Sequence, residues 1–199
     1  MEFSNEKYIE KARNVLIDVT DFLDEYKIPY CLEAGTLLGM LRDVDIIPCD
    51  HDIDISISID HAQNLNKVRW KLLFKGYKVV SRRNKVDNGP MKKKELRIFK
   101  VKPLWKSIFK LVIPSLEEKC VVLDIFIRSD NDNYTYFISN TKICKVDKKF
   151  FSSFETVTFR NRSLKIPNFA DEYLTQRYGD WSVPVKDWDS ARDDLSNTN

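Results

Sequence analysis

The sequence predicts an α+β fold, in which a mixed β-sheet is flanked by helices and a small helical part lies at the C-terminal end. Three patterns support this prediction. Apolar residues recur at helical spacing between Tyr8 and Leu23, isoleucine occupies every odd position from Ile53 to Ile59, and the run from Cys120 to Ile127 is almost entirely apolar. These patterns are typical of an amphipathic helix, of a strand with one buried face and of a core strand. With 199 residues, 43% of them hydrophobic, we expect one domain over residues 1–185 and a polar C-terminal tail over residues 186–199.

The first half of the chain is expected to begin with a helix over residues 8–23, for which Ser4 or Asn5 can serve as the N-cap and which ends before Pro29. Asp60 is the expected N-cap of a later helix, which Gly76 ends. After the first helix, we expect a short strand over 30–33, a short helix over 36–41 and a loop over 43–49. The strand with isoleucine at every odd position from 53 to 59 follows, and then a helix over 62–75.

The second half is expected to continue with strands over residues 77–83 and 96–101, joined by a mobile, basic and turn-rich loop over 84–94. Residues 104–113 mix basic and bulky apolar side chains, which predicts a short packed helix or, alternatively, a helix on a membrane surface. The remaining expectations are a strand over 120–127, two β segments over 156–159 and 164–166, a helix over 169–178 and a loose end of about ten residues.

The net charge is only +3, from 33 Lys and Arg against 30 Asp and Glu, which argues against a nucleic-acid-binding protein. The charge is nevertheless uneven, because residues 82–110 contain eleven basic residues and, as acids, only Asp87 and Glu95. This basic segment is either ordinary solvated surface or a contact for an anionic ligand, a polymer or a membrane surface.

The four cysteines are widely spaced without a C-x-x-C motif, and histidine occurs only twice. Neither a structural zinc site nor a disulfide scaffold is therefore expected. The first ten residues lack the apolar core of a signal peptide, and no stretch approaches 18 apolar residues. We therefore expect a cytoplasmic protein, which the basic segment could hold at the inner face of a membrane.

The main chemical signal is a set of carboxylates on predicted strands. If the isoleucines face the core, Asp50, Asp52 and Asp54 all point the other way, while Asp124 is the single acid in an apolar strand. Carboxylates held together repel each other, and a buried acid is costly unless it is paired or coordinates a metal. We therefore predict a site for Mg²⁺ or Mn²⁺ that Asp124 completes. The alternative for Asp124 is a backbone hydrogen bond or a lysine partner.

Several other motifs are excluded. Asp50, Asp52 and Asp54 have the spacing that opens an EF-hand loop, but the sixth and twelfth positions, where that loop needs Gly and Glu, hold Ile55 and His61. The chain has no Walker A motif and no G-x-G-x-x-G. The two histidines give no convincing catalytic triad.

Gly35 and Thr36 open the predicted short helix directly after a strand. The free backbone N–H groups and the positive end of a helix favour an anion at this place, so phosphates bound there would meet the metal site. Arg42, near the end of the same helix, is a candidate phosphate ligand. The alternative for Arg42 is a surface salt bridge with Asp43 or Asp45.

Residues 32–42 read LEAGTLLGMLR and residues 46–54 read IIPCDHDID. Together with VLDIF at residues 122–126 and motifs over residues 166–184, these runs resemble the LicD family. That family contains bacterial phosphorylcholine transferases and the fukutin and fukutin-related proteins, on a nucleotidyltransferase-type fold. The sequence departs from the family at Cys49, where Trp is usual, and at His51, where Asp is frequent.

The resemblance implies metal-dependent transfer of a phospho-alcohol group, phosphocholine or a polyol phosphate, from a CDP-activated donor to a hydroxyl of a glycan or sugar acceptor. It implies that the catalytic and metal-binding residues are Asp52, Asp54 and Asp124, and that the donor phosphates lie near Gly35, Thr36 and Arg42. Two alternatives stay open. One is a nucleotidyltransferase that moves a nucleoside monophosphate from an NTP to a small molecule, a protein or an RNA end, and the other is a non-catalytic metal- or nucleotide-binding accessory protein.

Overall fold

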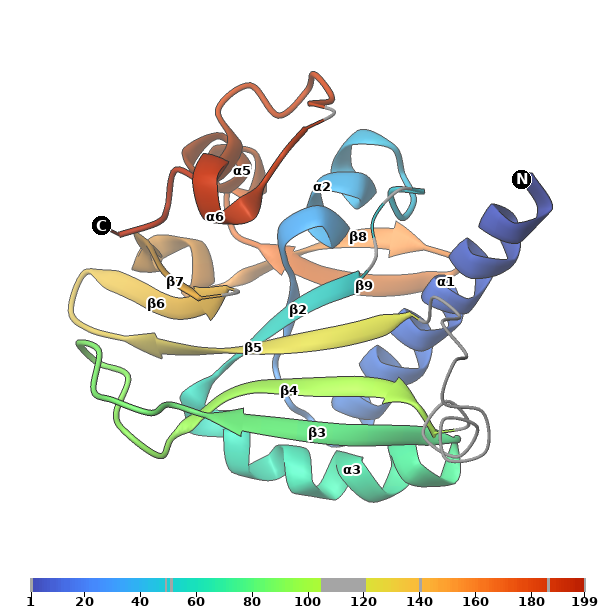
Figure 1. Ribbon diagram of the computed structural model, residues 1–199, viewed down its shortest axis with the longest axis horizontal. Helices are drawn as coiled ribbons and strands as arrows, with labels where there is room; N and C mark the ends of the chain where they lie inside the picture. The colour runs from blue at the N-terminus through green and yellow to red at the C-terminus, as the bar shows by residue number, and fades with distance from the viewer. Residues whose placement is uncertain are drawn as a thin grey trace.

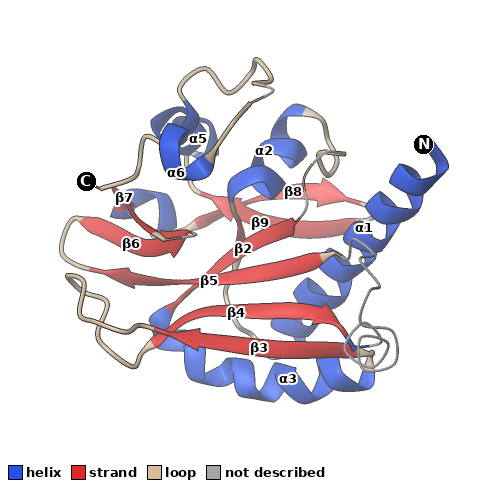
Figure 2. Ribbon diagram, viewed as in Figure 1, coloured by secondary structure: helices blue, strands red, loops and turns tan. Residues whose placement is uncertain are grey.

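The computed structural model describes residues 2–48, 50, 52–104, 121–139, 141–185 and 187–198, with only the backbone for residues 2–5. Within these residues, seven strands form one mixed sheet and two further strands form a small antiparallel sheet (Figure 1). Helices lie against the large sheet, and short helices follow near the C-terminus (Figure 2). The predicted α+β fold class is therefore confirmed.

The centre of the large sheet is the parallel pair of β2 (Asp52–Ser58) and β5 (Val122–Asp130). On the far side of β2, the short strand β1 (Cys31–Leu32) pairs with it in antiparallel direction. On the far side of β5, β4 (Leu96–Pro103) is antiparallel to it, and β3 (Tyr77–Arg83) forms the edge next to β4. The predicted strands at these places are therefore all present, with boundaries that differ by a few residues.

The register of β2 against β5 gives each face of the sheet its character. Ile55 lies opposite Ile125, and Asp54 lies opposite Asp124. The isoleucine face is fully buried, because Ile55 is 0% exposed and belongs to the same apolar cluster as the inward side of α1 (Glu2–Glu25). Figure 2 shows α1 crossing behind the sheet and α3 (Leu65–Phe74) running along β3. The carboxylates therefore project from the face opposite these two helices.

A hairpin that the sequence analysis did not predict continues the sheet beyond β5. It consists of β6 (Tyr134–Ser139) and β7 (Lys142–Asp147), which pair in antiparallel register. β6 also pairs with the end of β5, at Ser129 and Asp130. The alternation of Tyr134, Thr135, Tyr136 and Phe137 is a strand pattern, and the preceding Asn-Asp-Asn is a turn signal.

The chain then reaches the C-terminal part through a 3₁₀ turn at Lys148–Phe151. β8 (Phe154–Phe159) and β9 (Arg162–Pro167) form the small antiparallel sheet, as the sequence predicted for this region. α5 (Ala170–Tyr178) follows, close to its predicted bounds, and α6 (Ser190–Asp193) lies next to it in Figure 1.

Two local predictions were wrong. The helix predicted over 62–75 begins later, because residues Ile59–Asn64 form a 3₁₀ turn and α3 starts at Leu65. The N-cap of α3 is therefore Asn64 and not Asp60. The 3₁₀ turn is capped by Ser58, whose hydroxyl accepts a hydrogen bond from the backbone N–H of Asp60. The loop predicted over 84–94 does join β3 to β4, and backbone hydrogen bonds, with a β-bridge from Asn88 to Met91, hold it. Its predicted mobility stays untested.

The end of the chain was also predicted wrongly, because it is not loose. Asp194 and Ser196 are each 4% exposed. The backbone of residues 196–198 runs beside β7, where the Lys145 N–H donates to the Ser196 carbonyl and the Thr198 N–H donates to the Ile143 carbonyl. The helix predicted over 104–113 lies, apart from Leu104, outside the described residues. None of the described helices is long and apolar enough to cross a membrane.

The first testable prediction concerns Gly39, which lies in the short helix α2 (Ala34–Arg42). A Cβ atom at this position would lie 2.5 Å from the backbone oxygen of Asp45 and 3.0 Å from a side-chain carbon of Ile47. Because a backbone atom cannot move aside alone, we expect Gly39→Ala to lower the free energy of unfolding by about 1–3 kcal/mol in urea denaturation.

Gly35→Ala is the matched control in the same helix. The atom that a Cβ would meet there is the end of the Asp50 side chain, which can rotate away. The control should therefore lose less stability, and equal losses in the two variants would contradict the packing argument.

Candidate active site

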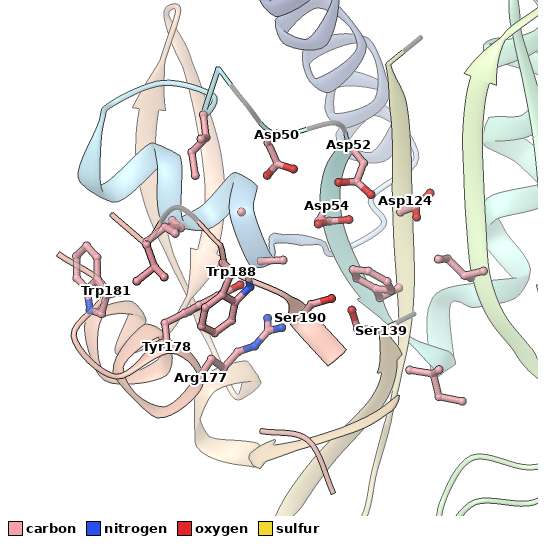
Figure 3. Close-up of a pocket in the computed structure, with 18 of the residues that line it drawn as sticks. Asp50, Asp52, Asp54, Asp124, Ser139, Arg177, Tyr178, Trp181, Trp188 and Ser190 are labelled. Carbon is pink, nitrogen blue, oxygen red and sulfur yellow. The ribbon is translucent and has the colours of Figure 1, made fainter. Parts of the chain in front are cut away.

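A cavity of about 800 Å³ opens on the carboxylate face of the sheet. Figure 3 shows its two sides: carboxylates from β2 and β5 point in from one side, and aromatic residues of the C-terminal part stand on the other. Among the residues that line it are Gly35, Arg42, Asp50, Asp52, Asp54, Arg82, Arg97, Lys100, Asp124, Tyr178, Trp181 and Trp188.

Three of the predicted site residues converge in this cavity. Asp52, Asp54 and Asp124 each offer a carboxylate oxygen such that these oxygens lie within 4.8 Å of one another. Asp54 and Asp124 are only 8% and 4% exposed, whereas Asp52, at the start of β2, is more open. The parallel register explains the arrangement, because it sets Asp54 directly opposite Asp124 on one face of the sheet.

The electrostatics of this cluster are unfavourable without a compensating charge. Burial is the main cause that raises the pKa of Asp54 well above its ordinary value, and the charges of Asp52, Asp50 and Asp124 raise it further. Burial also raises the pKa of Asp124, although Lys100 opposes this shift. The Oδ1 atoms of Asp54 and Asp124 are buried and have no hydrogen-bond partner among the described residues. Oxygen ligands in this state suit a hard divalent cation.

Lys100 is a cation that pairs directly with the cluster. It stands on β4 opposite Asp124 and makes an ion pair with Asp124 Oδ2. The lysine partner that the sequence offered as the alternative for Asp124 is therefore present, while the other oxygen of Asp124 has no hydrogen-bond partner among the described residues. The metal role of Asp124 stays a prediction. One ammonium group cannot neutralise three carboxylates, so the cluster still carries excess negative charge.

The predicted phosphate-binding residues on α2 differ in what they do. Gly35 lines the cavity, and the Asp50 carboxylate fills the space where a side chain at position 35 would be. The Thr36 hydroxyl is buried, and its oxygen accepts a hydrogen bond of 2.9 Å from the backbone N–H of Asp54. Thr36 thereby holds β2 in place next to α2. Arg42 lines the cavity and pairs with Asp43 at 2.9 Å, which is the alternative that the sequence offered, and its role as a phosphate ligand stays a prediction.

Sequence reasoning missed a buried ion network at the wall of the cavity, centred on Arg177. Glu33, directly before α2, is 0% exposed and accepts hydrogen bonds from the Tyr173 hydroxyl at 2.7 Å, from Arg177 at 3.0 Å and from the Ser56 hydroxyl at 2.9 Å. Arg177, on α5, also binds Asp194 through Nη2 at 2.5 Å. The network therefore connects β1, β2, α5 and the chain end.

No local signal in the sequence marks this network, because its contacts join residues up to 144 positions apart. Glu33 stands beside the motif residues and could be taken for a surface acid, and Arg177 for an ordinary charged residue at the end of a helix. Burial raises the pKa of Asp194, but the charge and hydrogen bonds of Arg177 outweigh it, so that the pKa is lowered overall.

Residues 27–169 match the protein family described as LicD/FKTN/FKRP, nucleotidyltransferase domain. The chain is similar to ribitol-5-phosphate transferase FKTN of Macaca fascicularis, with 27% identity over 92% of this chain and 36% of that protein. Ribitol 5-phosphate transferase FKRP of Homo sapiens is 39% identical over 26% of this chain and 10% of that protein. The chain thus spans about a third of the length of the FKTN protein that it matches.

Among solved structures, the lincosamide antibiotic adenylyltransferase LnuA with bound lincomycin is similar, with a TM-score of 0.45 and 19% sequence identity. The similarity covers 80% of this chain and 82% of that chain. It is too distant to bear on function.

The second testable prediction concerns the buried network. Arg177→Met would leave Glu33 and Asp194 as buried carboxylates without their cation, so we expect the free energy of unfolding to fall by about 3–5 kcal/mol. Arg162→Met is the matched control, because Arg162 pairs with Asp21 on the surface, where both side chains are more than 40% exposed. The control should lose less than about 1 kcal/mol. A loss of this small size in Arg177→Met as well would disprove the structural role of the network.

The third testable prediction concerns pH. The pKa of Asp54 is higher in the folded state than its ordinary value of 3.8, so the folded state binds more protons and stability falls as the pH rises above 3.8. Asp54→Asn removes this loss. In the absence of divalent cations, we expect the variant to be more stable than the wild type at neutral pH.

Urea denaturation between pH 4 and pH 8 measures this effect. The advantage of Asp54→Asn should grow as the pH rises, whereas Asp132→Asn, at an exposed turn, should show no such trend. An Asp54→Asn variant that is less stable than the wild type across the whole range would refute the charge-repulsion argument.

Proposed function

The chain belongs to the LicD/FKTN/FKRP family, and from this premise we propose that it is a metal-dependent phosphotransferase. In this proposal it moves a phospho-alcohol group, phosphocholine or a polyol phosphate, from a CDP-activated donor to a hydroxyl of a glycan or sugar acceptor. The observation that carries the proposal is the convergence of Asp52, Asp54 and Asp124 in a cavity beside the first turn of α2. The printed names of the FKTN and FKRP relatives, ribitol-phosphate transferases, support the class of group that is moved.

Asp52, Asp54 and Asp124 are the proposed ligands of Mg²⁺ or Mn²⁺. The donor set fits such an ion, because all three are carboxylates and two of them have buried oxygens without a partner among the described residues. When bound, the ion would neutralise the donor diphosphate and stabilise the leaving phosphate oxygen.

The reaction is an in-line displacement at the phosphorus of the alcohol phosphate. The acceptor oxygen forms a bond to this phosphorus, the bond from the phosphorus to the bridging oxygen breaks, and CMP leaves with that oxygen. The proton of the acceptor hydroxyl passes to a carboxylate of the cluster, for which we propose Asp124. Positioning and charge stabilisation supply most of the acceleration in phosphoryl transfer, so few further groups are needed.

The remaining cavity residues would position the substrates. Gly35 at the start of α2 and Arg42 at its end lie on the side assigned to the donor phosphates. Arg82 and Arg97 line the same cavity from β3 and β4 and belong to the basic segment 82–110. We assign the acceptor to this side. Contact of the rest of that segment with a membrane surface, and the cytoplasmic location, stay predictions.

The fourth testable prediction is the reaction itself. The purified protein is incubated with Mg²⁺ or Mn²⁺ and a panel of CDP-alcohols and NTPs, with sugar acceptors, and the released nucleotide is identified by chromatography. We expect CMP from a CDP-alcohol, no release after chelation of the metal, and a loss of at least about 100-fold in Asp52→Asn and Asp54→Asn, because each variant removes a charged ligand.

Asp132→Asn is the control and should retain the wild-type rate, because Asp132 is an exposed residue of the turn before β6. Pyrophosphate released from an NTP would replace the proposal with nucleotidyl transfer. Metal-independent release of CMP, or full activity in Asp54→Asn, would contradict the assignment of the carboxylates.

A further inference from the structure

Two aromatic rings stand in the cavity across from the carboxylates (Figure 3). Tyr178 is the last residue of α5, and Trp188 precedes α6. Their ring centroids are 4.8 Å apart with an interplanar angle of 45°. Both residues line the cavity. The proposed phosphoryl-transfer chemistry uses neither ring, so the pair is available to bind another part of a substrate.

We propose that Trp188, backed by Tyr178, is the platform on which the pyrimidine base of the nucleotide donor stacks. This inference rests on the proposed function, because it assumes a nucleotide donor. It adds the residue that recognises the nucleobase, and it gives the donor a direction in the cavity: the base lies on the aromatic side and the diphosphate on the carboxylate side.

The two sides of the cavity differ in chemistry, and each suits one part of a nucleotide donor. A diphosphate needs cations and backbone N–H groups, which the carboxylate side offers through its proposed metal site and the start of α2. A nucleobase is planar and has an aromatic face, which stacks on tryptophan and tyrosine rings. The Asp54 charge contributes to the raised pKa of Tyr178, for which burial is the main cause, so the aromatic side lies within electrostatic reach of the cluster.

The same rings are less suited to a cationic alcohol such as choline. The guanidinium carbon of Arg177 lies 5.4 Å from the centroid of the Tyr178 ring. This cation of the chain itself already interacts with Tyr178, and it is fully buried, with 1% of its surface exposed. The Tyr178 ring therefore already has a cation of the chain beside it, whereas stacking of a neutral base on Trp188 does not compete with Arg177. The choice between base and alcohol therefore favours the base.

The platform is also held rigidly, which lowers the entropy cost of binding. Arg177 precedes Tyr178 and is bound on both sides by Glu33 and Asp194. Asp194 follows α6, and the backbone N–H of Leu195 donates to the Arg177 carbonyl. The segment that carries Trp188 is therefore anchored to α5 at its far end by a buried ion pair and a backbone hydrogen bond.

The test compares binding of CDP and of pyrophosphate, in the presence of Mg²⁺, by titration calorimetry. Pyrophosphate contains the diphosphate without the base, so the difference between the two ligands isolates the contribution of the base. We expect Trp188→Leu to weaken CDP binding about five- to a hundred-fold, the range for loss of one base–aromatic stack, and to leave pyrophosphate binding unchanged. Trp188→Phe keeps an aromatic face and should bind CDP within about threefold of the wild type.

Trp70→Leu is the matched control. Trp70 is 64% exposed on α3, on the opposite side of the sheet from the cavity, and its replacement should change neither affinity. Thermal unfolding of each variant checks that it is folded. If Trp188→Leu does not fold, the comparison of Trp188→Phe with the wild type still tests the platform.

Each other outcome rejects a defined part of the argument. Equal CDP affinity in Trp188→Leu and the wild type overturns the platform and leaves the proposed function intact. Loss of phosphocholine binding in Trp188→Leu, with CDP binding retained, overturns it in favour of an alcohol site. A wild-type protein that binds pyrophosphate but gains nothing from the cytidine of CDP overturns the platform and the CDP donor together.

Discussion

The parallel pairing of β2 with β5 is the constraint on which the site depends. It sets Asp54 beside Asp124, and with Asp52 it holds three carboxylate oxygens within 4.8 Å. Such an arrangement is unfavourable by itself, because buried like charges repel and lose their hydration. The opposite face of the same two strands supplies the compensation: its isoleucine and leucine side chains are buried completely, and burial of each is worth about 1.5–3 kcal/mol. The apolar face fixes the register, and the register then forces the acids together.

The residues around the cluster hold the three carboxylates close together and do not relieve their mutual repulsion. Thr36 binds the backbone of Asp54, and Lys100 reaches only one oxygen of Asp124. Neither contact removes the repulsion among the carboxylates, which leaves them with the properties of a cation site. On the other side of the cavity, the Glu33–Arg177–Asp194 network holds the C-terminal part against β1 and β2. The cavity thus has two sides built from separate parts of the chain, and a buried ion pair joins them.

The extent to which sequence predicted this molecule follows from the range of the interactions involved. The isoleucine alternation and the acid within VLDIF are local patterns, and they were enough to predict β2, β5 and the three carboxylates that the structure brings together. The β6–β7 hairpin carried a local signal that was overlooked. The contact between Glu33 and Arg177 joins residues 144 positions apart, so no local period or motif reports it. The docked chain end was missed for a related reason: its polar residues are typical of a solvated tail, and only the pairing of Asp194 with Arg177 makes their burial favourable.

The two sides of the cavity come from different parts of the chain. Gly35, Asp54 and Asp124 lie within residues 27–169, whereas Tyr178 and Trp188 lie beyond them. The carboxylate side, where phosphate chemistry is proposed, lies inside the residues that match the family model. The similarity to FKTN covers 92% of the chain, so it is not confined to that side. Because the Glu33–Arg177–Asp194 network fixes the aromatic side against the carboxylate side, the geometry of the cavity depends on this network as well as on the register of β2 and β5.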